Sequence, residues 1–302
     1  MPFDTTSQEQ VYKWFFILIF REMSKSNMII IVSISSVLLV VICLYAFYYN
    51  RWKHLWALET NIASHSPYEI ESNKDSSLRV AMIGDSWAGL HHEQNMDTYL
   101  SSLLKQQIGS PVFVESKGNG GGKARGIYKL MFKIGEFGTK PLLSQKPDYC
   151  IISAGINDAA ANLGTKQYCY YYRKILDFLL ANGIRPVVLE VPNVNLWHLY
   201  GGKPLKDLAA DFVRSTMTGC KMYQFGGYRD ALYLMLVNEG LMDKVVYVSM
   251  SSWNDASPDI DQNLFLSDQV HLNRRGYERL DSSIAVAIAR DLRNSSDSGF
   301  IY

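Results

Sequence analysis

The chain has 302 residues, which is enough for one substantial domain with a buried core and additional segments. Its 30 basic and 29 acidic residues give a formal net charge of +1, so composition excludes the strongly basic surface typical of nucleic-acid-binding proteins. The four cysteines form no Cys-x-x-Cys pair, which argues against a zinc ribbon and a thioredoxin motif. Cys43 lies in an apolar segment, and the other three cannot all pair with one another, which argues against a disulfide framework.

The first predicted element is a membrane-spanning helix over residues 28–49, preceded by a tail over residues 1–27. The segment contains no charged residue, proline or glycine, and a spanning helix needs roughly 20 predominantly apolar residues. Tyr48, Tyr49 and Trp52 lie at its C-terminal end, as in an aromatic belt. A buried core helix and a cleaved signal peptide are the alternatives, but no small-x-small cleavage site follows. We expect an uncleaved single-pass anchor.

Basic residues predict the orientation of this anchor. Three precede the span and two follow it directly, which favours a cytoplasmic N-terminus and a large domain on the outer, extracytoplasmic side. The cysteines of the large domain, predicted to be free thiols, argue in the other direction. Residues 50–77 are mostly polar and are predicted to form a juxtamembrane linker.

The main domain is predicted over residues 78–293, with a C-terminal tail over 294–302. Short apolar runs bounded by turn residues predict buried strands, and longer amphipathic stretches between them predict helices. The strands are expected near residues 80–83, 111–115, 148–153, 186–191 and 245–249, with a closing helix over 273–292. This alternation predicts an α/β fold with a parallel five-stranded sheet covered by helices on both faces.

A candidate nucleophile stands where the first predicted strand ends. The apolar run is followed by Gly84-Asp85-Ser86, and the glycine permits a sharp turn that presents Ser86 at the carboxyl end of the strand. Ligands bind at that edge in open α/β sheets. A serine hydroxyl is a weak nucleophile until a base removes its proton, so Ser86 needs a partner elsewhere in the chain.

A candidate base lies near the C-terminus, where Asp268 precedes His271 by three residues. Within one turn of chain this spacing lets the carboxylate approach the imidazole. A carboxylate on one ring nitrogen fixes the tautomer and leaves the other nitrogen to deprotonate a serine. Taken alone, an Asp-x-x-His sequence is more commonly a surface pair or a helix cap.

Two further motifs follow the second and third predicted strands: the glycine-rich loop Lys117–Lys123 and Gly155-Ile-Asn-Asp158. Together and in this order, the four motifs closely resemble the SGNH hydrolase superfamily, the broader grouping around the GDSL esterases and lipases. The resemblance covers about residues 78–292. It implies a flavodoxin-like three-layer α/β/α sandwich and hydrolysis of an ester through an acyl-enzyme.

The resemblance also implies a role for each motif residue. Ser86 is the nucleophile, His271 the general base and Asp268 the group that orients it. The oxyanion hole is formed by the backbone N–H groups of Ser86 and Gly120 and by the side-chain amide of Asn157. Each such donor contributes roughly 10²–10³ in rate, because a tetrahedral intermediate concentrates negative charge on one oxygen.

The glycine of the oxyanion hole is selected by spacing. Gly118, Gly121 and Gly122 compete with Gly120, which we choose because Gly126 follows it by six residues, as the family's second motif suggests. No metal ion or cofactor is implied. Reading the aspartates and the histidine of these motifs as hard metal ligands would leave the serine idle.

Five further residues receive simpler interpretations. Trp87 follows the nucleophile and is expected to line the acyl or sugar pocket, in the position where the family has leucine. His91 and His92 are expected to form a surface pair. Asp85 and Asp158 are interpreted as structural residues that bond loop amides or cap helices.

The sequence therefore predicts a membrane-anchored serine esterase that removes small acyl groups, most simply acetyl, from carbohydrate. Its expected partners are a small acylated substrate or glycan and, through residues 28–49, the lipid bilayer, with no nucleic acid. The alternatives are an O-acetyltransferase acting on glycan, a lysophospholipase or thioesterase, and a pseudoenzyme that binds glycan without turnover. The complete set of motif residues argues against the last. Oligomeric state is not indicated.

Overall fold

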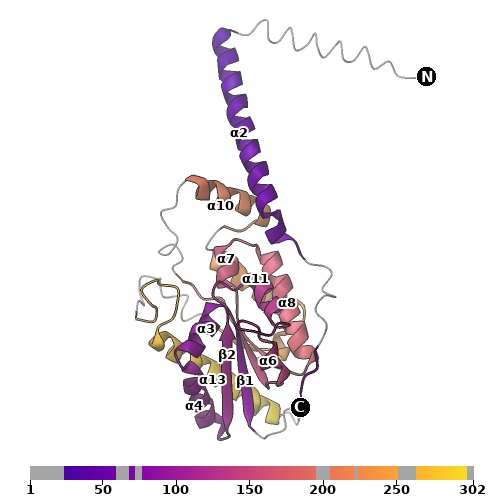
Figure 1. The fold of residues 1–302 in the computed structure, drawn as a ribbon, viewed down its shortest axis with the longest axis vertical. Helices are drawn as coiled ribbons and strands as arrows, with labels where there is room; N and C mark the ends of the chain where they lie inside the picture. Colours follow the sequence, from indigo (N-terminus) through magenta and orange to yellow (C-terminus); the bar gives the residue numbers. More distant parts are fainter. Residues whose placement is uncertain are drawn as a thin grey trace, which may run out of the picture. The chain divides into compact units, whose positions relative to one another are not determined.

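The computed structural model describes residues 24–58, 68–71, 77–194, 205–221, 224–250 and 263–297. The chain divides into two compact units, Met1–His54 and Leu55–Tyr302 (Figure 1). The first contains most of one long helix, and the second contains the sheet and the helices around it. The predicted tail over residues 1–27 lies almost entirely outside the described residues.

The long helix is α2, Lys25–Trp56, and it is long and apolar enough to cross a membrane. None of its residues is buried, and it extends beyond the predicted span of residues 28–49 at both ends. The extension follows from composition, because the flanking residues include good helix formers and neither proline nor glycine. At 1.5 Å per residue its 32 residues cover about 48 Å, more than the hydrocarbon thickness of a bilayer.

The second unit is built on one five-stranded sheet in which every pair of neighbours is parallel. The strand order is β2-β1-β3-β4-β5, so the first strand lies inside the sheet. This confirms the predicted α/β architecture. The strands are β1 Leu78–Gly84, β2 Val112–Gly118, β3 Tyr149–Ser153, β4 Arg185–Leu189 and β5 Val246–Val248.

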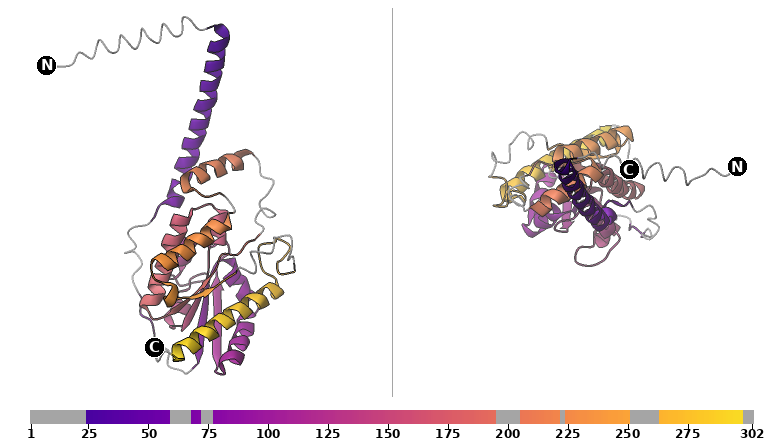
Figure 2. Two further views of the ribbon diagram at one scale, coloured as in Figure 1. Left: turned by 180° about the vertical axis from the view of Figure 1, so that it is seen from behind. Right: turned by 90° about the horizontal axis from the view of Figure 1, so that it is seen from above.

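Helices cover both faces of this sheet, as Figure 2 shows. On one face lie α3 (Ser86–Glu93), α4 (Met96–Ile108) and α13 (Arg274–Asp297), and on the other α5 (Ala124–Leu130), α8 (Thr165–Ala181) and α11 (Phe225–Asn238). The remaining elements are α6 Lys140–Ser144, α7 Ile156–Ala160, α10 Leu205–Thr218 and the 3₁₀ turn η2 Met242–Lys244. Because all strands are parallel, their carboxyl ends share one edge, where the predicted motifs meet.

The described part of the predicted linker over residues 50–77 is not a free tether. Tyr68 and Ile70 pack against the core of the second unit, and the Glu71 N–H donates to the Ser144 carbonyl at 2.8 Å. Because polar residues surround Tyr68 and Ile70 in the sequence, the segment shows no pattern that predicts this contact. Residues 59–67 and 72–76 of the linker lie outside the described residues.

Candidate active site

Ser86 is the first residue of α3, directly after the turn that ends β1. The Asp85 carboxylate caps this helix by accepting the Trp87 N–H at 3.0 Å. Gly84 is required at the turn, because a Cβ there would overlap the Ser153 carbonyl of β3. At the first helical position the Ser86 N–H has no partner within the helix, which leaves it free to face a bound oxygen.

His271 and Asp268 lie in a tight loop that leads into α13. The Leu266 N–H donates to the His271 carbonyl at 2.7 Å, and Gln269 adopts a positive φ of 59° at the tip. One oxygen of Asp268 accepts the backbone N–H groups of Val270 and His271, both at 2.9 Å. The other lies 2.6 Å from His271 Nδ1. The backbone of the loop therefore sets the angle at which the carboxylate meets the ring.

The structure brings this loop to Ser86 across 185 residues of sequence. His271 Nε2 lies 2.9 Å from Ser86 Oγ, within hydrogen-bond reach. The side chains of His271 and Asp268 are 27% and 28% exposed, so a substrate can reach the contact. Partial burial raises the pKa of Asp268, but hydrogen bonds from His271 and the backbone outweigh it and lower that pKa overall. The carboxylate is therefore ionised at neutral pH.

Asn157, in the first turn of α7, reaches the same edge of the sheet. Its amide nitrogen lies 3.3 Å from an Asp85 oxygen and 3.1 Å from the Gly122 carbonyl. The other Asp85 oxygen accepts the Ser153 hydroxyl at 3.0 Å. Burial raises the pKa of Asp85 to about 6, and hydrogen bonds from Trp87 and Ser153 oppose that rise. Asp85 thus joins the helix cap to Asn157, as its interpretation as a structural residue predicts.

The glycines of the loop after β2 differ in their surroundings. Gly118 packs against the turn of the nucleophile, because a Cβ there would overlap the Asp85 carbonyl and the Gly89 nitrogen. A Cβ on Gly122 would crowd the Asn119 carbonyl. Gly120 has open space around its Cα, so a side chain at that position meets nothing within 4 Å. The assignment of Gly120 as the second oxyanion donor stays a prediction.

Trp87 packs inward in this structure, beside a small cavity that it lines with Asp85 and Ser153, and its expected role in an acyl or sugar pocket stays a prediction. Its side chain is buried in the core with 2% exposure, and its Nε1–H donates to the Val270 carbonyl at 3.0 Å. The physical reason is the direction of α3. With Ser86 half-buried at the first helical position, the next residue points under the helix and into the protein.

The expectation of a surface pair at His91 and His92 is wrong for the first of them. The His91 side chain is fully buried, whereas that of His92 is 62% exposed. A helix that begins at Ser86 places His91 four residues after Trp87, on the same face. The four-residue spacing from Trp87 could have predicted the burial of His91, but only if the first residue of the helix were known.

Asp158 gives the folded state a pH dependence. Both of its carboxylate oxygens accept the Ala124 N–H, at 3.3 and 3.0 Å, and burial raises its pKa to about 7. Unfolded aspartate has a pKa of about 3.9, so the folded chain binds more protons between these values. The free energy of unfolding should therefore fall as pH rises from about 4 to about 7, by at most about 4 kcal/mol from this group.

Asp158→Asn tests this dependence, since the amide keeps an acceptor oxygen for Ala124 and removes the charge. We expect denaturant unfolding of the variant to show a flatter pH slope between about pH 4 and 7, with Asp85 supplying what remains. Asp177→Asn, an exposed aspartate, is the matched control. A variant slope equal to that of the wild type would contradict the prediction.

No group of three or more histidine, cysteine, aspartate or glutamate side chains within the described segments could hold a metal ion. The aspartates near Ser86 are engaged with backbone amides, hydroxyls and the imidazole instead. A parallel α/β/α sandwich with a serine, an imidazole and a carboxylate in contact at its carboxyl edge is the arrangement of ester-hydrolysing serine hydrolases.

Comparison with known proteins agrees with that class. Residues 82–279 match the GDSL-like Lipase/Acylhydrolase family. The chain therefore belongs to this family, within the SGNH hydrolase superfamily, and is an ester-hydrolysing enzyme. No protein of curated function matches its sequence.

The solved structures to which this chain is similar include the following two. A lipase/acylhydrolase from Enterococcus faecalis is 15% identical, with a TM-score of 0.48 over 70% of this chain and 95% of its own. A GDSL-like lipase from Bacteroides thetaiotaomicron is likewise 15% identical, with a TM-score of 0.46 over 82% of this chain and 98% of its own.

Proposed function

We propose that this family member is a membrane-anchored serine esterase that removes acetyl or similarly small acyl groups from carbohydrate. The observation that carries the catalytic part is the 2.9 Å contact between Ser86 Oγ and His271 Nε2, with Asp268 2.6 Å from the opposite ring nitrogen. Family membership supports an acylhydrolase. The choice of a short acyl group and a sugar rests on the external location expected of the domain.

In the proposed mechanism, His271 Nε2 takes the Ser86 proton as Oγ attacks the ester carbonyl. Asp268 holds the ring by its Nδ1–H and stabilises the imidazolium that forms. The tetrahedral oxyanion is stabilised by the N–H groups of Ser86 and Gly120 and by the Asn157 amide, one of whose two N–H groups exchanges its contact with Asp85 or Gly122 for the oxyanion. The intermediate collapses as His271 protonates the leaving alcohol, and a water molecule, deprotonated by the same nitrogen, hydrolyses the acyl-enzyme.

Asn157→Ala tests the oxyanion donor. The variant should lose about 10²–10³ in kcat with little change in KM, because the amide acts on charge that exists only in the transition state. The measurement is hydrolysis of p-nitrophenyl acetate by the detergent-solubilised chain. Asn162→Ala replaces an asparagine bonded to Ser215 and Cys220 and serves as a control for general effects on folding. A rise in KM alone would exclude the assigned role.

The substrate is tested with esters of increasing chain length and with acetylated glycans. The proposal predicts release of acetate from an acetylated polysaccharide and fastest turnover of acetyl among p-nitrophenyl esters. Preference for octanoyl or longer chains, or release of fatty acid from lysophospholipid, would replace it with a lipid esterase. Acetyl appearing on an added sugar hydroxyl instead of in solution would replace hydrolysis with transfer.

Anchoring is supported by the length and apolar character of α2. The proposed attachment predicts that the full chain sediments with membranes after alkaline carbonate washing, and that a chain lacking residues 1–54 does not. Protease added to intact cells should degrade the catalytic domain if it faces outward. Protection of the domain would reverse the proposed orientation without affecting the assigned chemistry.

A further inference from the structure

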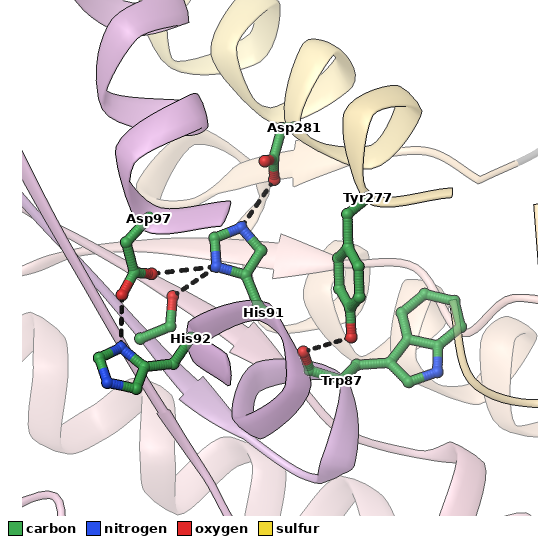
Figure 3. Close-up of polar contacts among 7 residues, drawn as sticks. Trp87, His91, His92, Asp97, Tyr277 and Asp281 are labelled. Atoms are coloured by element: carbon green, nitrogen blue, oxygen red, sulfur yellow. Dashed lines mark hydrogen bonds and ion pairs between the residues drawn. The ribbon is translucent and has the colours of Figure 1, made fainter. Parts of the chain in front are cut away.

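A second serine, histidine and aspartate lie in contact on the far side of α3. Ser116 Oγ lies 2.9 Å from His91 Nδ1, and His91 Nε2 lies 2.9 Å from Asp281 Oδ1 (Figure 3). All three residues are buried, and the side chains of His91 and Asp281 have no exposed surface. The array resembles a catalytic triad in its contacts, but it is sealed from any substrate and so has a different use.

The charge on His91 follows from its partners. Nδ1 also lies 3.0 Å from Asp97 Oδ1, so each ring nitrogen faces a carboxylate. A neutral imidazole carries one N–H and cannot donate to both, whereas an imidazolium can. Burial lowers the pKa of His91, but the hydrogen bonds to Asp281 and Asp97 outweigh it and raise that pKa to about 9. Burial also raises the pKa of Asp281, and the hydrogen bond and charge of His91 oppose that rise. The His91 ring thus joins two carboxyl groups inside the protein, one at each ring nitrogen.

The His91 ring links α3, the short helix that begins at Ser86, to its neighbouring elements. His91 is on α3, Asp97 on α4, Ser116 on β2 and Asp281 on α13, so four elements meet at one ring. The eight-residue helix α3 buries only three side chains, among them His91. Its position therefore depends strongly on the polar contacts of that residue.

A second connection leads from the cluster to the catalytic base. The Tyr277 ring packs edge-on against His91 at 5.5 Å, and its hydroxyl donates to the Trp87 carbonyl at 2.9 Å (Figure 3). The Trp87 indole in turn donates to the carbonyl of Val270, at 3.0 Å. Trp87, which follows Ser86, is thereby bonded to Val270, which precedes His271. Through the Tyr277 hydroxyl, Trp87 is also bonded to α13.

We propose that His91 is a positioning residue for the esterase: by joining α3 to α4 and α13, it holds Ser86 within reach of His271. This inference rests on the proposed function of Ser86. Acyl transfer needs the attacking oxygen in contact with its base, and a misplacement of about 1 Å costs about 10²-fold in rate. Neither His91 nor Tyr277 touches the reacting atoms, so each acts through the backbone of α3.

The test compares His91→Gln, Asp281→Asn and the double variant in the detergent-solubilised full chain. Active sites are counted by complete reaction with a fluorophosphonate that labels Ser86, and kcat is expressed per labelled site. We expect kcat for p-nitrophenyl acetate to fall by about 10- to 100-fold in each single variant, with KM within about twofold of the wild type. The double variant should lose much less than the product of the two losses, because both remove the same link.

His92→Gln is the matched control, since His92 neighbours His91 and contacts the same Asp97, at 2.6 Å, from the surface. Its kcat should equal that of the wild type. Tyr277→Phe removes only the hydroxyl bonded to Trp87, and it decides the question if the His91 and Asp281 variants do not fold. It should lower kcat about 3- to 10-fold at unchanged KM.

A lower melting temperature with unchanged kcat per labelled site, in the His91 and Tyr277 variants, would overturn the inference and leave a purely structural role. Failure of the proposed function gives a different result. In that case the wild type hydrolyses no ester, and the rate at which the fluorophosphonate reacts with Ser86 is measured instead. This rate is expected to fall in the His91, Asp281 and Tyr277 variants by the same factors as given for kcat. A wild-type Ser86 that also resists phosphonylation would overturn both.

Discussion

Ser86→Ala is expected to lower kcat for p-nitrophenyl acetate by roughly 10⁴–10⁶-fold, the largest effect of any single substitution in this chain. The physical reason is that the proposed acyl-enzyme forms on Ser86 Oγ, the oxygen that lies 2.9 Å from His271 Nε2. The rate should fall to the level of water attack assisted by the oxyanion donors. Melting temperature should change little, because the hydroxyl is partly exposed.

The serine mechanism is refuted if turnover persists in Ser86→Ala. Ser102→Ala provides the control, since this exposed hydroxyl bonds only a carbonyl of its own helix among the described contacts. Its activity should match the wild type. A burst of p-nitrophenol followed by slower steady turnover would add direct evidence for the acyl-enzyme in the unmodified chain.

Asp268→Asn is expected to cost about 10⁴-fold in kcat, the second largest effect. The neutral amide still fits the loop and can accept the N–H groups of Val270 and His271. However, its NH₂ group facing Nδ1 would select the tautomer with the proton on Nε2, which cannot deprotonate Ser86. Steady-state hydrolysis measures the loss, with KM expected to change little.

The exposed Asp177 supplies the control for Asp268, because Asp177→Asn removes an equal charge far from the loop in sequence and should leave kcat unchanged. The lowered pKa of Asp268 adds a further expectation. In the wild type, no loss of activity between about pH 5 and 8 should come from protonation of this carboxyl. An Asp268→Asn variant with wild-type kcat would remove the residue from the mechanism.

Most of the fold and the Asp268–His271 contact could be predicted from sequence, because the relevant signals are local, whereas the pairing of Ser86 with His271 followed from the family resemblance. The apolar run before Gly84 predicts a buried strand, and alternation of strands with helices predicts a parallel sheet. A parallel sheet places every strand's carboxyl end at one edge, which brings Ser86 and Asn157 together without further information. Asp268 and His271 are three residues apart, so their contact is local as well.

The features that sequence did not predict depend on long-range packing. Trp87 and His91 acquire their burial from α13, whose Tyr277 and Asp281 lie 190 residues further along the chain. A helix of eight residues offers only two turns, too few for its periodicity to identify the buried face. The docking of Tyr68 was missed for a related reason, since it is one of two apolar residues in a polar stretch.

The compact loop that holds Asp268 and His271 has a consequence for how the enzyme assembles. The contact between Asp268 and His271 forms within a few residues, so in the proposed mechanism a single tertiary encounter, that of Ser86 with His271, completes the catalytic apparatus. Gain of activity during refolding should then report the arrival of the C-terminal segment on the finished sheet. Truncation between Val248 and this loop would abolish the proposed apparatus while leaving all five strands encoded.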